Sequence, residues 1–223
     1  MTYSPEQPPE HPAATYYPAP AYAAGPPKNL TAQGVLAFGT ASLATVFSLV
    51  TATISGRAMR HLDDDEIDWS LAAYGIGSLL EVLALLAGWI TGSLWLYQAR
   101  KNAELINPAA TFVRSPGWAW GGWICPVVSF WFPFQVVRDT HRAVAARLFD
   151  STLIGWWWGL FLFMNVGSWL AGRAQDDATA ADASAVQAAD VFFSLVMLVA
   201  LALWGLIIRR VTVEQHARIY GPR

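Results

Sequence analysis

Charged residues are scarce in this chain. They make up 13% of its 223 residues, whereas hydrophobic residues make up 55%. Soluble globular domains carry about 25% charged residues, so the deficit predicts a membrane protein. The net charge is −2 and the arginines are scattered along the chain. This distribution gives no basic domain and excludes nucleic acid as a partner.

Catalytic signatures are missing as well. The chain has no H-E-x-x-H, no G-x-S-x-G, no P-loop and no dinucleotide fingerprint. Its single cysteine, Cys125, excludes an internal disulfide and a multi-cysteine metal site, and next to Pro126 we expect this thiol to be a buried packing group. We therefore predict no enzyme activity and no catalytic, cofactor-binding or metal-binding residue.

Four apolar runs are present, each long enough to cross a bilayer, for which about 20 residues suffice. They predict an all-α, polytopic membrane protein with spans at about 30–55, 71–97, 152–171 and 191–208. In the first span, Ser48, Thr51 and Ser55 share one helical face. Such small hydroxylated faces pack against other helices in membranes, and the alternative is that they line a polar cavity.

Glu81 is the only charged residue inside a predicted span. An ionisable side chain at membrane depth is costly and is a functional candidate by default. The alternative is a glutamate that is protonated, or hydrogen-bonded to a neighbouring helix, with no role beyond structure. Asn165 is a further polar residue inside a span, the third.

The two ends of the chain differ in composition from the spans. Residues 1–28 contain eight prolines and four tyrosines, a composition that cannot bury enough apolar surface to fold. We predict a disordered cytosolic tail there, either an inert tether or an arm that docks a protein partner. Residues 211–223 form a second cytosolic tail, so the transmembrane domain covers 29–210.

Lysine and arginine are distributed unevenly between the spans. Ten of the fourteen lie in 98–116, in 136–151 and in the segment after Ile208, whereas the acidic loops 57–70 and 172–190 hold three. Because lysine and arginine mark cytosolic loops, the basic segments and both termini are predicted to be cytosolic.

This topology constrains the stretch 115–135, which holds four tryptophans and three prolines. Both its flanks are basic, so a full crossing would place one of them outside. We therefore predict a broken segment that enters the bilayer or lies along its inner face and returns, followed by an amphipathic helix over 136–149 in the headgroup plane. The alternative is a fifth, kinked span, which would separate the two termini across the membrane.

The broken segment also carries a family resemblance. The runs WLYQARKNAELI at 95–106, RSPGWAWGGWICPVVSFWFPFQVVRD at 114–139 and GWWWGLFLFMN at 155–165 resemble the bacterial membrane family called domain of unknown function 4328. The resemblance implies a multi-pass protein of the bacterial plasma membrane and brings no activity with it. Its motif residues in this chain are Pro116, Gly117, Trp118, Trp123, Pro126, Trp131 and Pro133.

A second group of candidate residues is predicted to lie at the cytosolic boundary: Trp95, Arg100, Asn102, Arg114, Arg138, Asp139 and Arg142. Arginine suits phosphate because its donors form a planar fork, and basic pockets on the inner face bind anionic lipids. The group therefore indicates a pocket for an anionic headgroup. The alternative is ordinary interfacial anchoring by aromatic and basic side chains.

Together these features favour a non-enzymatic scaffold, regulatory or lipid-interacting module whose main partner is the bilayer itself. A small transporter or channel component that uses Glu81 and the broken segment is the alternative, because transporters place broken helices at their binding sites. An integral-membrane enzyme comes third. The sequence assigns no oligomeric state.

Overall fold

The computed structural model describes residues 26–61, 69–145, 151–175 and 182–221, and this part of the chain is all-helical without a strand. The predicted tail 1–28, apart from its last three residues, and half of the acidic loop 57–70 lie outside the described residues. In chain order the elements are α1 (Thr31–Arg60), α2 (Trp69–Ile106), α3 (Trp118–Ile124), the 3-10 turn η1 (Val128–Phe130), α4 (Phe132–Val144), α5 (Ser151–Gln175) and α6 (Ala183–Tyr220).

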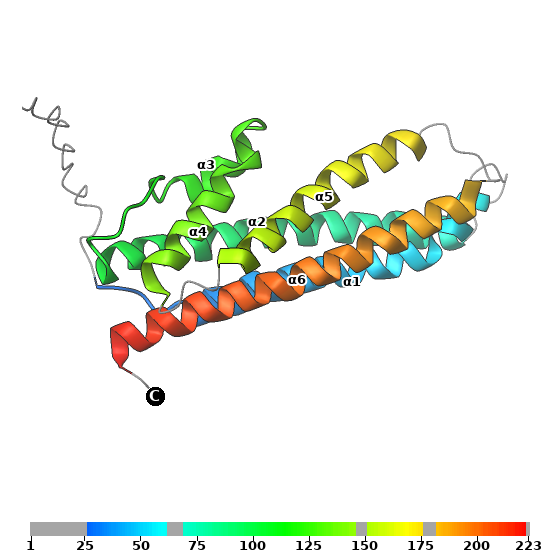
Figure 1. Ribbon diagram of the computed structural model, residues 1–223. Coiled ribbons are helices and arrows are strands. Elements are labelled where there is room, and N and C mark those ends of the chain that lie inside the picture. The colour runs from blue at the N-terminus through cyan, green and yellow to red at the C-terminus, as the bar shows by residue number, and fades with distance from the viewer. Residues whose placement is uncertain (1–25, 62–68, 146–150, 176–181, 222–223) are drawn as a thin grey trace, which may run out of the picture.

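Four long helices, α1, α2, α5 and α6, run lengthwise through the molecule (Figure 1) and are long and apolar enough to cross a membrane. Helix α1 packs along α2 and α6, and α5 packs along α6. The start of α1 and the end of α6 lie at the same end of the bundle, which we call the terminus end. The opposite end, where α1 leads to α2 and α5 leads to α6, we call the hairpin end.

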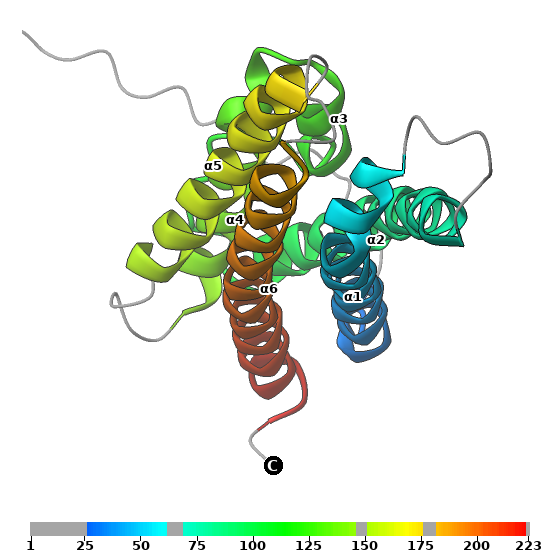
Figure 2. The same ribbon diagram turned by 90° about the vertical axis from the view of Figure 1, so that its right-hand side faces the viewer.

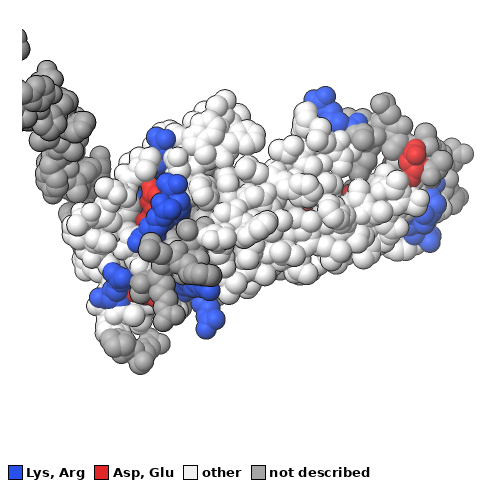
Figure 3. Space-filling view, viewed as in Figure 1, with Lys and Arg blue, Asp and Glu red and all other residues white. Residues whose placement is uncertain are grey.

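The charge distribution follows this bundle. Charged side chains gather toward the two ends, with a broad uncharged band between them (Figure 3). In α2 no charge occurs between Glu81 and Arg100, and in α6 none occurs between Asp190 and Arg209. Each uncharged run has 18 residues, or about 27 Å of helix, close to the ~30 Å thickness of a bilayer core. The chain is therefore an integral membrane protein, as its composition predicts.

The helices extend beyond the predicted spans. Helix α2 ends at Ile106, immediately before Asn107-Pro108, because a proline disfavours helix in the residue before it. Helix α6 continues to Tyr220 where we predicted a tail from 211 onward. The extension is held by packing, since Val211 and Gln215 are buried and the Gln215 amide donates to the Ala99 carbonyl at 2.8 Å.

The broken segment does not cross the bundle. Helix α3, η1 and α4 all lie in the terminus-end half (Figures 1 and 2), and α4 returns toward the end from which α3 departs. The segment packs between α2 and α5, which it contacts through α3 and α4. This arrangement is the re-entrant form of the prediction, with four spans rather than five.

The turn of this segment satisfies its own backbone. Ser129 N donates to the Cys125 carbonyl, Trp131 N donates to the Val128 carbonyl, and the Trp158 indole donates to the Phe130 carbonyl at 2.9 Å. Non-helical backbone at membrane depth requires such partners. Cys125 itself is exposed, so the prediction that it is a buried packing group is wrong: the segment turns at this residue and points its side chain outward.

Helix α4 differs from the amphipathic helix predicted over 136–149. It begins at Phe132, because Pro133 fits the first turn of a helix, and it ends at Val144. Its side chains are buried on several faces, since Val136, Val137 and Asp139 point in different directions round the helix and are each at most 5% exposed. The helix therefore packs inside the bundle, against α2, α5 and α6, rather than lying flat in the headgroup plane. Residues 146–149 are outside the described part.

Candidate functional site

At the terminus end, Arg100 is almost fully buried, with 2% of its side chain exposed. Its Nη2 donates to the Arg114 carbonyl at 2.9 Å, its Nη1 lies 2.8 Å from a Glu104 carboxylate oxygen, and its guanidinium stacks 3.5 Å from the centre of the Phe112 ring. A buried, stacked guanidinium with a partly exposed carboxylate partner is a structural arrangement. Arg100 therefore holds the loop after α2 against that helix.

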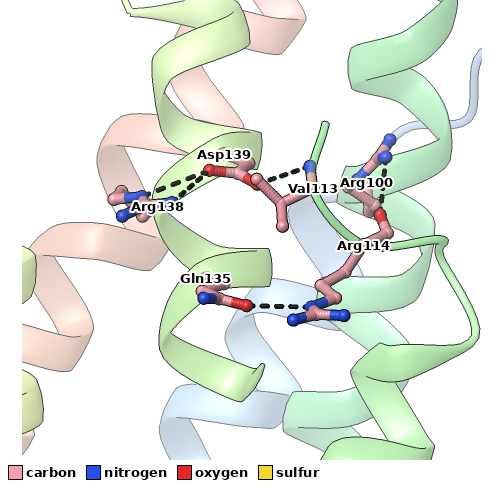
Figure 4. Close-up of polar contacts among 6 residues, drawn as sticks. All are labelled: Arg100, Val113, Arg114, Gln135, Arg138 and Asp139. Atoms are coloured by element: carbon pink, nitrogen blue, oxygen red, sulfur yellow. Dashed lines mark hydrogen bonds and ion pairs between the residues drawn. The ribbon is translucent and has the colours of Figure 1, made fainter. Parts of the chain in front are cut away.

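Two further groups attach the same loop to α4, as Figure 4 shows. The Val113 amide donates to Asp139 Oδ2 at 3.0 Å, and Arg114 Nε donates to Gln135 Oε1 at 2.9 Å while its guanidinium stacks 3.6 Å from the Phe132 ring centre. Asp139 Oδ1 also accepts from Arg138, at 3.1 Å and 3.2 Å. We call the six residues of Figure 4 the terminus-end network: Arg100, Val113, Arg114, Gln135, Arg138 and Asp139.

Asn102 and Trp95 connect other segments at this end. Asn102 donates to the Lys28 carbonyl at 2.7 Å and accepts from the Lys28 amide at 3.0 Å, which fixes the chain just before α1. The fully buried Trp95 donates from its indole to Thr212 Oγ1 at 3.2 Å and meets Trp204 edge to face. Asn102 therefore holds the chain before α1 against α2, and Trp95 joins α2 to α6.

The structure thus brings most of the predicted boundary group together, but not as an open pocket. Arg100 Nη2, Arg100 Nη1 and Arg114 Nε face the protein's own carbonyl, carboxylate and amide oxygens. Arg100 Nε is buried without a hydrogen-bond partner among the described residues, whereas Arg142 is exposed on α4 outside the network. Sequence reasoning could identify the arginines at this boundary. It could not identify their partners, because those partners lie on three separate segments.

The motif residues of the broken segment play mixed roles. Pro116 and Pro133 are buried, and Pro133 packs against Gly122, where an added Cβ would lie 3.3 Å from the proline ring. Gly117 caps α3, and Trp118 meets Phe132 edge to face at 4.5 Å. Pro126 and Trp131 are exposed at the turn. These residues give the segment its compact hairpin shape.

Trp123, the remaining aromatic of the motif, reaches the middle of the bundle. Its indole donates to the Ala119 carbonyl at 3.0 Å, and its ring meets Trp158 and Phe161 edge to face. There it lines a hollow of about 250 Å³ that we call the apolar chamber. The chamber is otherwise lined by α1, α2, α5 and α6, including Trp89, Trp157 and Trp204, and its only hydroxyls are those of Thr45 and Ser93.

Glu81 lies in a second hollow, of about 210 Å³, which we call the polar chamber. Thr51 Oγ1 lies 3.4 Å from Glu81 Oε2, and Ser48 and Ser194 join hydroxyls at 2.9 Å. Asp190 lines the same chamber. The face of Ser48 and Thr51 on α1 is therefore a cavity lining, which was the alternative to pure helix packing, while Ser55 is buried.

The two chambers follow each other along the bundle axis. On each helix their lining residues are about one turn apart: Thr45 and Ser48 on α1, Leu85 and Glu81 on α2, Met164 and Ser168 on α5, and Met197 and Ser194 on α6. Helices α2 and α5 both line the chambers but lie on opposite sides of α1 and α6 (Figure 2) and are not packed along each other. The side of both chambers between α2 and α5 is therefore not closed by helix packing.

Sequence reasoning missed Asp190, which it assigned to an outer loop. A signal was present, because Asp190 precedes Arg209 by the same interval as Glu81 precedes Arg100, and this equal spacing places both acids at one level. Asn165, in contrast, is exposed, donates to the Phe161 carbonyl at 2.8 Å and lines neither chamber. Among the described residues no group of three potential metal ligands occurs.

Comparison with known proteins gives one match. The model of a family described as a domain of unknown function (DUF4328) matches residues 58–213. No curated protein and no solved structure matches the chain. The matched range runs from the end of α1 into α6, so it includes the whole re-entrant segment and the acidic residues of the polar chamber.

Proposed function

The chain belongs to the DUF4328 family, and we propose that it is a non-enzymatic membrane module that holds the hydrocarbon chain of a lipid inside its helix bundle. The observation that carries this proposal is the apolar chamber. Its volume of about 250 Å³ exceeds that of a ~150 Å³ apolar cavity that binds benzene. It lies within the uncharged band, where lipid chains are the abundant ligand.

The chamber's lining supports a flexible apolar occupant. Four tryptophans provide large rigid surfaces, and Met164 and Met197 provide side chains that adapt to irregular shapes. Access does not require the helices to separate, since α2 and α5 leave the chamber open toward lipid. A lipid chain could therefore enter sideways from the bilayer.

The family resemblance implies the bacterial plasma membrane, and the charge bias between the two ends supports an orientation with the terminus end in the cytosol. The hairpin end carries Arg57, Arg60 and Arg173. The terminus end carries Lys28, Arg100, Lys101, Arg114, Arg138, Arg142, Arg209, Arg210 and Arg218. Because cytosolic segments carry the excess of lysine and arginine, this bias favours cytosolic termini and hairpins that face outward.

A transporter or channel component remains the alternative, and the polar chamber is the observation that favours it. Such a protein needs a polar path from Glu81 to both faces. Between Glu81 and the terminus-end network lies the apolar chamber, which offers only the hydroxyls of Thr45 and Ser93. A desolvated ion in such a compartment is costly, so the geometry supports lipid binding over ion conduction.

Native mass spectrometry of the full chain released from mild detergent tests this proposal. We expect one lipid to stay bound per chain after annular lipids have dissociated. Leu85→Trp places a larger, aromatic side chain in the chamber wall and should reduce the lipid-bound fraction. Leu83→Trp is the matched control, because Leu83 is on the same helix, is similarly exposed and lines neither chamber. Equal retention in the two variants would contradict the proposal.

A further inference from the structure

The polar chamber has an unusual position for a cavity with carboxylates. Glu81 and Asp190 each mark the hairpin-end limit of an uncharged run of about 27 Å. The chamber therefore lies at the depth where the bilayer core meets the headgroups, and the apolar chamber lies one helical turn deeper, at the depth of the chains. A lipid in the leaflet at the hairpin end has its polar head and its hydrocarbon chains in the same order.

From this arrangement we propose that the polar chamber binds the protonated amine of an amphiphile whose hydrocarbon chain lies in the apolar chamber. The inference rests on the function proposed above and adds the chemical class of the ligand's head. Each chamber alone is below the ~300 Å³ lower limit of ordinary ligand pockets, whereas the two combined lie within that range. A ligand that spans both fits the available space better than one confined to either.

The charge of the chamber selects a cationic head. Glu81 and Asp190 are the only charged residues among those that line it, and no lysine or arginine does. Two described guanidiniums at this end stack over aromatic rings, Arg57 over Trp69 and Arg173 over Trp169. An anionic head would meet the carboxyl groups of Glu81 and Asp190 and no basic side chain among the lining residues, so it is disfavoured.

The Thr51 hydroxyl of the chamber is placed to accept a hydrogen bond. The Thr51 hydroxyl has one hydrogen, and its contact with the Phe47 carbonyl at 2.9 Å is shorter than its 3.4 Å contact with Glu81. The Ser48 and Ser194 hydroxyls lie 2.9 Å apart and either can be the donor, while Ser194 Oγ also lies 3.1 Å from the Ser48 carbonyl. Because the Thr51 hydrogen goes to a helix carbonyl, the Thr51 oxygen keeps its lone pairs as acceptors. An ammonium group supplies three donors and no acceptor, which complements such a lining.

Competition between ligands of one chain length tests the inference. The delipidated full-length protein is mixed with equimolar hexadecylamine, hexadecanol and hexadecanoate, and the bound species are resolved by mass. We expect the amine to be preferred over the alcohol by about ten- to hundredfold, the range expected for hydrogen bonds to a charged group. Glu81→Gln and Asp190→Asn should each reduce this preference by about tenfold. Asp182→Asn should not, because Asp182 is an acid at the same end that lines neither chamber.

The outcomes separate the two proposals. If the three ligands bind equally and Leu85→Trp still removes them, the amine site is refuted and the lipid-binding function stands. If the amine is preferred and the preference depends on Glu81 and Asp190 but not on Leu85, the amine site stands and the chain-binding function fails. If none of the three ligands binds, both are refuted. Binding of phosphatidylethanolamine in preference to its N-acetylated form would show that a membrane lipid, as well as a free alkylamine, supplies the ammonium group.

Discussion

Replacing Arg100 by methionine tests whether the boundary arginines bind a ligand or hold the protein together. Methionine keeps the length and apolar character of the side-chain stem and removes the guanidinium. The Arg114 carbonyl then loses its 2.9 Å donor, Glu104 loses its ion-pair partner, and the stack over Phe112 is lost. If Arg100 instead served an anionic headgroup, the variant would fold normally and bind less lipid.

The three losses can be estimated separately. A hydrogen bond from a charged donor contributes about 1.5–3 kcal/mol. An ion pair with a partly exposed carboxylate contributes about 0.5–1 kcal/mol, and a cation–π contact a similar amount. Partial retention of stem packing offsets some of this, so we expect Arg100→Met to lower the free energy of unfolding by about 3 kcal/mol. For a chain of this size that corresponds to a decrease of about 6–12 °C in Tm.

The assay is thermal unfolding in detergent, followed by hydrogen exchange of the loop between α2 and α3. Exchange of the Val113 amide, which donates to Asp139, should accelerate in Arg100→Met because the loop loses its attachment to α2. Arg142→Met is the matched control, since Arg142 is exposed at the same end. A typical surface substitution changes the free energy of unfolding by about 0.5 kcal/mol or less. If the free energies of unfolding of the two variants differ by no more than this, the structural role of Arg100 is refuted.

Three further predictions follow from the fold. A spin label on Cys125, the only cysteine, should be more accessible to oxygen than to a water-soluble nickel complex; the reverse would place the turn of the re-entrant segment outside the bilayer. Gly56→Ala should destabilise by about 1–3 kcal/mol, because its Cβ would lie 3.0 Å from the Ala183 carbonyl, whereas Gly39→Ala meets nothing within 4 Å and should be neutral or stabilising; equal melting temperatures would contradict this packing. Compartment-sensitive reporters fused to the two chain ends should report the same side of the membrane, and opposite sides would exclude an even number of spans.

The number of spans and the re-entrant segment could be predicted from the sequence because the bilayer imposes simple limits. An apolar run of about 20 residues without a charge must cross the bilayer or be shielded from water. The two basic flanks of 115–135 have to stay on the same side of the membrane. These constraints act on each segment by itself. They need no knowledge of which helices are neighbours, and so one sequence suffices to apply them.

The roles of the arginines and of Asp190 could not be predicted in the same way. The number of lysines and arginines near Arg100 and Arg114 indicates on which side of the membrane this segment lies. Whether their guanidiniums face a phosphate or the protein depends on the groups that tertiary packing places beside them, which are Phe112, Gln135 and a loop carbonyl. Asp190 lies at the edge of a polar segment, and only the packing of α6 against α1 shows that its side chain lines the chamber of Glu81.

The re-entrant segment also explains why the chambers exist. In the terminus-end half, α3 and α4 occupy the space between α2 and α5 and complete a packed core around Trp95, Val137 and Trp158. The segment turns back at Cys125–Phe130, so the same space is left without a helix in the hairpin-end half. Trp123, two residues before the turn, lines the apolar chamber there. A segment that crossed fully would fill both chambers with its own side chains. In this bundle the incomplete crossing therefore creates the cavity, and its turn determines how deep a bound lipid chain can reach.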